Sequence, residues 1–273
     1  MRYRESNAVP EASTDLTRLV RLAVDEGPRW GVVVGGTIHG LSGHPFVGWQ
    51  VGEPLVDLEA ASLLPPTEPS KVVCVGLNYR SHAEESEAEV PEEPLLFLKP
   101  PSAVVGPEVP IVRPPQSSRV DYEAELALVI GTRCRNVNAG MAWSYVAGVT
   151  CGNDVTARDL QARDDQWARA KGFDTFCPLG PWLVTGVGEA DLAELRVTCR
   201  VNGDLRQDGQ VPDMVFSPME LIAYISSIMT LEPGDVIMTG TPEGVGPLGH
   251  GDIVEVEIDS VGTLRNPVEN GVP

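Results

Sequence analysis

The sequence predicts a β-rich α+β fold with few helices, and three observations support this prediction. Glycine and proline are frequent, with 28 and 24 of 273 residues, and such punctuation suits short strands and turns better than long helices. Apolar residues alternate with other residues in several segments, most clearly in 120–131. Two segments carry clear helix signals, and strands and helices do not alternate regularly as in a βαβ array.

A proline-rich linker divides the chain at Pro65-Pro66-Thr67-Glu68-Pro69. Three prolines within these five residues resist both helix and sheet. We therefore predict a small N-terminal domain over residues 1–68 and a larger domain over 69–273. Within the first domain, Trp30–Ile38 has the pattern of a strand followed by a turn.

Two apolar runs near the start of the larger domain predict buried strands, at 71–76 and 94–99. Between them, His82–Pro94 contains six glutamates and little hydrophobic periodicity. A solvated surface loop is the expected structure for most of this segment. The alternative is a mobile lid over a site.

Two helices are predicted in the larger domain. Ser217 and Glu220 form a capping box with proline at the first helical position, and apolar residues recur behind it on one helical face. The second helix is expected to begin near Thr156, as its N-cap, and to continue through Gln166 or beyond. Strands are predicted at Leu195–Val201, before an Asn202-Gly203 hairpin turn, and then at 235–239 and 253–259.

The net charge excludes several partner classes. The chain has 20 Lys and Arg against 39 Asp and Glu, a formal charge of −19. Such a field repels phosphate backbones and anionic lipids, so neither nucleic acid nor membrane is an expected partner. No apolar run approaches the ~18 residues of a membrane helix, and the first fifteen residues lack the apolar core of a secretory signal.

The cysteines favour a reducing compartment. They are odd in number and widely spaced, without a C-x-x-C pair, so neither a zinc site nor a disulfide framework is indicated. We expect small core residues in a cytoplasmic protein. The five positions are Cys74, Cys134, Cys151, Cys177 and Cys199.

The most informative segment is 120–131, VDYEAELALVIG. Its alternation places Glu123 and Glu125 on one face of a strand, roughly 7 Å apart. The flanking residues are apolar, so we expect a central strand that is buried on at least one side. Like charges in poorly solvated space raise each other's pKa or require a cation. A half-exposed strand with ordinary surface charge is the alternative.

A third carboxylate, Asp154, stands just before the second predicted helix, where a turn or cap role is the alternative. Three carboxylates without clustered His or Cys describe a hard oxygen site. Mg²⁺ or Mn²⁺ fits such a site, Ca²⁺ is compatible with it, and Zn²⁺ is disfavoured. An octahedral ion with three protein ligands keeps open positions for a substrate oxygen or water.

His82 and Glu85 are three residues apart and share a face if this segment forms a helical turn. A carboxylate beside an imidazole orients it, selects its tautomer and raises its basicity. A solvated surface pair is the alternative for these two residues.

Further polar residues are candidates for binding a substrate. Lys171 lies in a stretch punctuated by Gly, Phe and Pro and could hold a substrate carboxylate, or be an ordinary surface lysine. Arg158 and Gln161 follow Asp154 on the predicted helix and face the same site unless that face is solvated. The glycine loop at 239–247 lacks a P-loop ending, but its glycines allow close backbone approach to a small anion, or simply form a tight turn.

Taken together, these motifs resemble the fumarylacetoacetate hydrolase family over about 70–273, and 1–65 resemble the short N-terminal domain of many bacterial members. The matching segments occur in family order: VVCVGLNYRSHAEE (72–85), LLFLKP (95–100), DYEAELALVIG (121–131), GNDVTARDLQ (152–161), AKGFDTFCPLGPWLVT (170–185), VNGDLRQDG (201–209) and IMTLEPGDVIMTGTPEGVGPL (228–248). The resemblance implies a mixed β-roll or barrel with few helices, and a homodimer.

The resemblance also implies roles for individual residues. Metal ligation is implied for Glu123, Glu125 and Asp154, with Mg²⁺ or Mn²⁺ as the cofactor and Ca²⁺ compatible in crystals. His82 and Glu85 are implied as the dyad that activates water or moves a proton. Lys171 matches the family lysine near metal and substrate, and the substrate-side segments contain Arg158, Gln161 and Thr241.

The chemistry of such a site suggests a small-molecule 2-oxo acid as substrate. A metal-stabilised enolate supports C–C hydrolysis, decarboxylation or isomerisation. We expect an enzyme acting on a 2-oxo or 2-hydroxy-dienoic diacid of aromatic-acid catabolism, of the 2-hydroxyhepta-2,4-diene-1,7-dioate isomerase type. The alternatives are an acylpyruvate hydrolase, an oxaloacetate decarboxylase and, from another class, a non-catalytic acidic metal-binding module.

Overall fold

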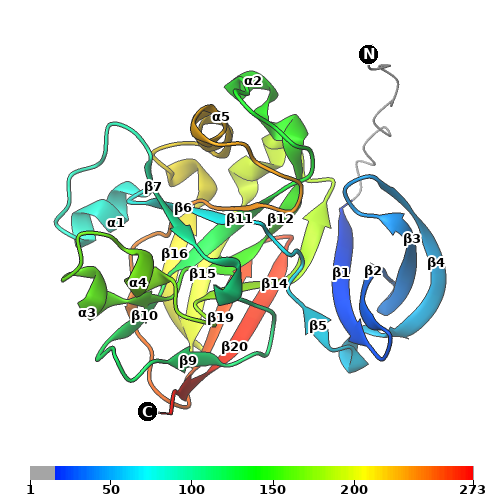
Figure 1. The fold of residues 1–273 in the computed structure, drawn as a ribbon, viewed down its shortest axis with the longest axis horizontal. Helices are drawn as coiled ribbons and strands as arrows, with labels where there is room; N and C mark the ends of the chain where they lie inside the picture. Colours follow the sequence, from blue (N-terminus) through cyan, green and yellow to red (C-terminus); the bar gives the residue numbers. More distant parts are fainter. Residues whose placement is uncertain (1–15, 273) are drawn as a thin grey trace.

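The computed structural model describes residues 16–272 and is rich in strands, with few and short helices (Figure 1). Residues 1–15, on which the prediction about a signal segment rests, lie outside the described part. In the described part, no helix is long and apolar enough to cross a bilayer. The helices are α1 (Arg80–Glu85), α2 (Ala139–Ala142), α3 (Arg158–Gln161), α4 (Ala168–Lys171) and α5 (Pro218–Ile228).

Within residues 16–272, the largest sheet contains twelve strands. Its N-terminal strands are β1 (Thr17–Val24), β2 (Gly27–Val34), β3 (Thr37–His44), β4 (Gly48–Asp57) and β5 (Leu63–Leu64). Its other strands are β6 (Val72–Gly76), β7 (Leu95–Lys99), β8 (Val104–Val105), β11 (Ala124–Ile130), β12 (Val146–Asn153), β14 (Cys177–Thr185) and β17 (Val236–Met238).

The N-terminal strands continue the sheet of the larger domain. Strand β1 pairs with β14, with Thr17 opposite Thr185 and Leu19 opposite Leu183. The proline-rich segment 65–69 forms neither helix nor strand and leads from β5 towards β6. The blue strands in Figure 1 therefore stand beside the larger domain as an extension of one sheet.

Two smaller sheets complete the larger domain. One has the order β13–β10–β18, from Thr156–Ala157, Val120–Tyr122 and Gly246–Pro247. The other has the order β16–β15–β19–β20–β9, from Asp204–Gln210, Arg196–Val201, Ile253–Ile258, Gly262–Asn270 and Ile111–Arg113. The strand-rich fold with few helices is confirmed, and within the described residues the sheets stay open and do not close into a barrel.

Strand β11 is buried on both faces, which explains its apolar flanks. All seven of its residues are buried. Leu126, Leu128 and Ile130 pack into one hydrophobic core, whereas Ala127 and Val129 pack into a second core on the opposite face. The alternative of a half-exposed strand is therefore wrong, and alternate residues of the strand enter different cores.

The helix expected from Thr156 to Gln166 is wrong in its start and its length. Thr156 and Ala157 are extended and pair with β10, and α3 spans only Arg158–Gln161. The Thr156 hydroxyl does not cap a helix because it donates to the Asp154 carbonyl oxygen at 2.8 Å and is 3.1 Å from Glu123 Oε1.

The other local predictions agree with the structure. Helix α5 begins at the predicted capping box, with the Ser217 hydroxyl accepting from the Glu220 N–H. Asn202 and Gly203 both have positive φ in the turn between β15 and β16. The five cysteines are free and buried, as small core residues.

Candidate metal centre and active site

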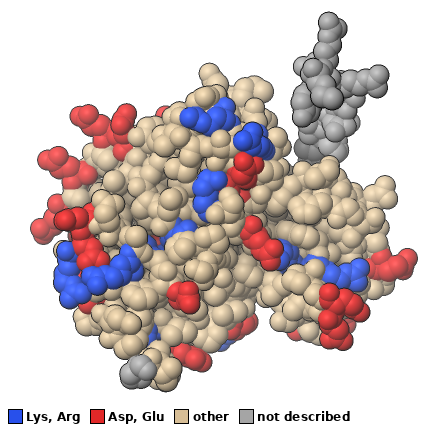
Figure 2. Space-filling model, viewed as in Figure 1, with Lys and Arg blue, Asp and Glu red and all other residues tan. Residues whose placement is uncertain are grey.

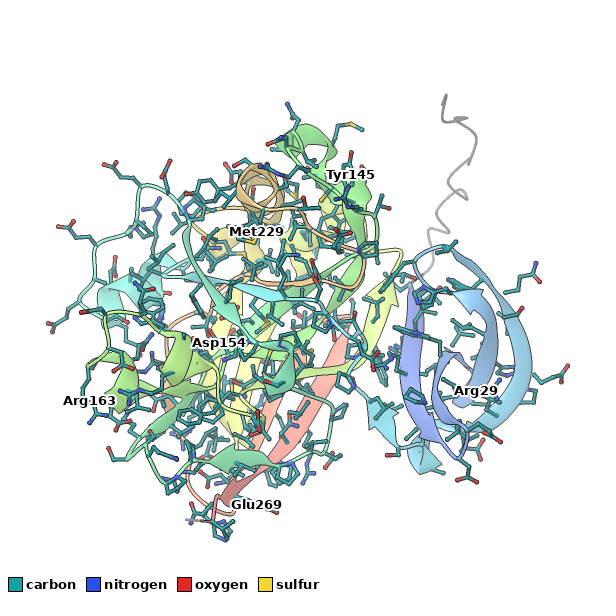
Figure 3. The ribbon with its side chains drawn as sticks, viewed as in Figure 1. Arg29, Tyr145, Asp154, Arg163, Met229 and Glu269 are labelled. Atoms are coloured by element: carbon teal, nitrogen blue, oxygen red, sulfur yellow. The ribbon has the colours of Figure 1, made fainter. Side chains whose placement is uncertain are left out.

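Three buried carboxylates meet in the middle of the larger domain. Glu125 lies on β11, Glu123 directly precedes this strand, and Asp154 follows β12. The pairing of β11 with β12 places Ala124 opposite Asn153, so the ends of both strands bring the three side chains together. One oxygen of each carboxylate lies within 4.8 Å of the others. Figure 3 shows Asp154 at the centre of the strands and helices of this domain.

Three basic side chains surround this cluster. Lys171 Nζ lies 2.9 Å from Glu123 Oε2 and 2.7 Å from Asp154 Oδ2. Lys99 Nζ lies 2.5 Å from Asp154 Oδ1, and Arg158 Nη2 lies 2.6 Å from Glu123 Oε1. Burial opposes the ionisation of Glu123, but Lys171 and Arg158 outweigh it and hold the pKa of this carboxyl well below its usual range.

Glu125 has a different environment from the other two carboxylates. Its Oε2 accepts a hydrogen bond of 2.7 Å from the Gly240 N–H. Burial, followed by the charges of Asp154 and Glu123, raises the pKa of Glu125 well above its usual range. A divalent cation would offset the charge of a third ionised carboxylate here, and the all-oxygen donor set suits Mg²⁺ or Mn²⁺.

The glycine loop binds carboxylates of the chain itself. Gly240 donates to Glu125, and Gly244 donates to both oxygens of Glu85, at 3.0 and 3.2 Å. Both glycines have positive φ. A Cβ at Gly244 would lie 2.1 Å from the Arg206 carbonyl oxygen, so this close approach requires glycine.

His82 and Glu85 form a pair on α1, as the spacing predicts. His82 Nδ1 lies 3.2 Å from Glu85 Oε2. The His82 side chain is 8% exposed and that of Glu85 is 35% exposed, so the imidazole is buried and the carboxylate is partly wet. The alternative of a fully solvated surface pair is therefore wrong for His82.

One cavity of about 290 Å³ joins these groups. Phe97 and Trp167 form an apolar wall, with their rings 5.3 Å apart in an edge-to-face arrangement. Eight of the nine predicted site residues line the cavity: His82, Glu123, Glu125, Asp154, Arg158, Gln161, Lys171 and Thr241. The ninth, Glu85, contacts the cavity-lining His82.

The candidate substrate-binding residues are held by defined contacts. Arg158 Nη1 donates to Gln161 Oε1 at 2.6 Å, so these two side chains are positioned together. Thr241 Oγ1 donates to the Ala124 carbonyl oxygen and accepts from Gln207 Nε2. Lys171 is buried rather than an ordinary surface lysine, and Arg158 is 23% exposed.

Sequence reasoning missed two charged residues at the site. Lys99 is fully buried and donates to Asp154 and to the Val155 carbonyl oxygen. Asp121 is also buried, and binds Arg119 and Arg158. A signal existed for each residue: a lysine ends the otherwise apolar β7, and Asp121 shares the alternating face of Glu123 and Glu125.

The sequence comparison agrees with this geometry. Residues 71–269 match the family model described as fumarylacetoacetate (FAA) hydrolase C-terminal. The chain belongs to this family. Residues 17–66 match a second model, described as Rv2993c-like, N-terminal.

Several related proteins are similar over most of the chain. An uncharacterised protein of Methanocaldococcus jannaschii is 53% identical over 74% of this chain and 84% of its own length. The human mitochondrial oxaloacetate tautomerase FAHD2A is 48% identical over 77% of this chain and 70% of its own length. The crystal structure of 2-hydroxyhepta-2,4-diene-1,7-dioate isomerase from Mycobacterium marinum has a TM-score of 0.86 and 43% identity, covering 94% of this chain and all of that one.

Proposed function

We propose that this protein is a divalent-metal-dependent enzyme that moves a proton on a 2-oxo or 2-hydroxy-dienoic acid, as a tautomerase or isomerase. One observation carries the proposal: a buried three-carboxylate cluster and a carboxylate-paired histidine line the same cavity. The names of the similar human tautomerase and mycobacterial isomerase support this reaction class.

The cluster would hold the metal through Glu123, Glu125 and Asp154. A bound Mg²⁺ or Mn²⁺ would supply positive charge next to the enolate oxygen of the substrate. Arg158, Gln161 and Lys171 line the same cavity and would bind the substrate carboxylate, because guanidinium and ammonium groups donate hydrogen bonds to carboxylates. Phe97 and Trp167 would exclude water from one side.

The proton would be moved by His82. Its Nδ1 faces Glu85, so Nε2 is the nitrogen that exchanges a proton with the bound acid. In the conversion of an enol to a keto acid, Nε2 accepts the enol O–H proton and a proton is returned to the neighbouring carbon. Glu85, fixed by the Gly244 N–H, stabilises the imidazolium between the two steps.

Hydrolytic C–C cleavage of an acylpyruvate is the second candidate. The same His82–Glu85 pair favours it, because an oriented imidazole can take a proton from water as well as from an enol. Decarboxylation of oxaloacetate would also use a metal held by the cluster. It would not require a proton to reach carbon before the C–C bond breaks.

The deciding experiment is a substrate panel followed by proton NMR. Oxaloacetate, acylpyruvates and 2-hydroxy-dienoic diacids are supplied with Mg²⁺ or Mn²⁺ in D₂O. We expect accelerated enol–keto interconversion or double-bond migration, with deuterium entering at carbon. Acetate or another cleaved acid from an acylpyruvate would favour hydrolysis. No metal-dependent change in any of these acids would contradict the proposal.

A further inference from the structure

A further buried carboxylate, Asp121, contacts Arg158, the arginine that lines the cavity. Asp121 is fully buried on β10 and joins two arginines. Its Oδ1 and Oδ2 accept from Arg119 Nε and Nη2 at 2.9 and 3.0 Å, and Oδ2 also accepts from Arg158 Nε at 3.0 Å. Arg158 lines the cavity and Asp121 does not, so the hydrogen bond from Arg158 connects Asp121 to the cavity.

The contacts of Arg158 fix its guanidinium from three directions. Nε donates to Asp121, Nη1 donates to Gln161, and Nη2 donates to Glu123. A guanidinium has five N–H groups in one plane, so two of them make no hydrogen bond within the described residues. These two remain for an acceptor in the cavity.

The backbone makes this arrangement rigid. Asp121 is opposite Thr156 and Val120 is opposite Ala157 in the β10–β13 pair, immediately before α3 begins at Arg158. The Arg158 N–H also donates to the Arg119 carbonyl oxygen at 2.9 Å. The carboxylate and the guanidinium therefore sit on paired segments that hold them at hydrogen-bond distance.

We infer that Asp121 is a positioning residue that holds the Arg158 guanidinium in place for the carboxylate of the bound acid. The inference rests on the proposed function, because it takes the ligand to be a 2-oxo acid. Without Asp121, the one carboxylate left to Arg158 is Glu123, so the guanidinium would lose the contact that fixes its Nε and would tilt towards Glu123, away from the carboxylate of the bound acid. The inference thereby assigns Asp121 a role in substrate affinity and none in proton transfer.

The test uses oxalate, a non-reacting dicarboxylate that resembles a 2-oxo acid, titrated by calorimetry into the full chain at saturating Mn²⁺. Asp121→Asn keeps the volume of the side chain and removes its charge. We expect its Kd for oxalate to rise about tenfold, the effect of losing one hydrogen bond between charged groups. The KM for a turned-over acid should rise in parallel, while kcat changes less than about threefold.

Two further variants separate positioning from a structural role. Arg119→Gln removes the half-exposed partner on the other side of Asp121 and should leave the Kd for oxalate within about threefold. In an Arg158→Gln background, Asp121→Asn should have no further effect on this Kd, because the group through which it acts is gone. Thermal unfolding checks each variant for folding, and Asp121→Ser replaces Asp121→Asn if the latter does not fold.

An unchanged Kd for oxalate in Asp121→Asn would overturn the inference. An equal loss in Arg119→Gln, or an undiminished loss in the Arg158→Gln background, would overturn it as well. A wild-type chain that binds Mn²⁺ but not oxalate contradicts the proposed function instead, so the two failures are distinguishable.

Discussion

The larger domain contains two acidic regions with opposite environments. Glu123, Glu125 and Asp154 are buried and share their space with Lys99, Lys171 and Arg158. The segment 84–93, which covers the end of α1 and the loop that follows, contains six glutamates, all of them exposed. Figure 2 shows acidic side chains gathered at the left edge of the molecule, where Figure 1 places this segment.

The difference teaches that burial, not the number of carboxylates, creates the need for a neutralising positive charge. Two unit charges 4 Å apart interact by about 1 kcal/mol in water but by about 4 kcal/mol in a partly buried setting. The exposed glutamates therefore need no counter-ion, whereas the buried cluster requires lysine, arginine, a proton or a metal. The following experiments test this contrast, beginning with the largest expected effect.

The strongest test of the contrast replaces one buried ligand by an isosteric neutral residue. Glu125→Gln keeps the size of the side chain and can still accept from the Gly240 N–H. We expect it to fold but to lose calorimetrically detectable Mg²⁺ and Mn²⁺ binding, and turnover with it. Glu89→Gln, in the exposed region, is the matched control and should bind as the wild type does. Retained affinity in Glu125→Gln would remove this residue from the ligand set.

The next effect concerns the proposed catalytic pair, His82 and Glu85. His82→Ala should lower turnover about 10²–10⁴-fold, the typical contribution of a general acid or base. Metal affinity should remain, because the imidazole is not needed to hold the ion. His250→Ala, an exposed histidine outside the cavity, is the control for steady-state kinetics. Wild-type turnover in His82→Ala would rule out its proposed role.

A comparison of ion pairs sharpens the contrast in stability. Lys99→Met leaves Asp154 without one of its two lysines in a fully buried site, which should cost about 3–5 kcal/mol. Arg133→Met breaks an exposed pair with Glu232 and should cost less than about 1 kcal/mol. Urea unfolding of the metal-free chain measures both. Equal costs for the two variants would contradict the account of the buried cluster.

The smallest effect is a dependence of metal binding on pH. Burial raises the pKa of Glu125 above its ordinary value of 4.5, so the metal-free site binds a proton that the metal must release. Metal affinity should therefore weaken as pH falls below this raised pKa. Calorimetry in buffers of different ionisation enthalpy measures the number of protons released on metal binding. If no proton is released, the raised pKa of Glu125 is contradicted.

The same raised pKa affects the stability of the metal-free protein. As pH rises above 4.5, Glu125 ionises in the unfolded chain before it ionises in the folded chain, so this group lowers the stability of the fold.

Much of the site could be predicted from local patterns. The period-two alternation of 120–131 predicted that Glu123 and Glu125 share a face, and the three-residue spacing on α1 predicted the His82–Glu85 pair. These predictions succeeded because the geometry of one strand or one helical turn determines them.

The rest depended on contacts between distant segments, which no local pattern contains. Lys99 reaches Asp154 across 55 positions of the chain, and Gly240 reaches Glu125 across 115. The helix expected at Thr156 was wrong for the same reason, since pairing with β10 held this residue extended. The pattern of the glycine loop fits either a site for a small anion or a tight turn, and it does not indicate that Gly240 and Gly244 donate to Glu125 and Glu85 of the chain itself.

The central claim is that Glu123, Glu125 and Asp154 bind one divalent cation. The most direct measurement is a crystal soaked in Mn²⁺ and its anomalous difference map at the manganese edge. We expect a single strong peak among the three carboxylates, with oxygen ligands at about 2.0–2.3 Å, the range of hard divalent cations. Peaks confined to the exposed glutamates of 84–93, or no peak among the three carboxylates, would contradict the claim.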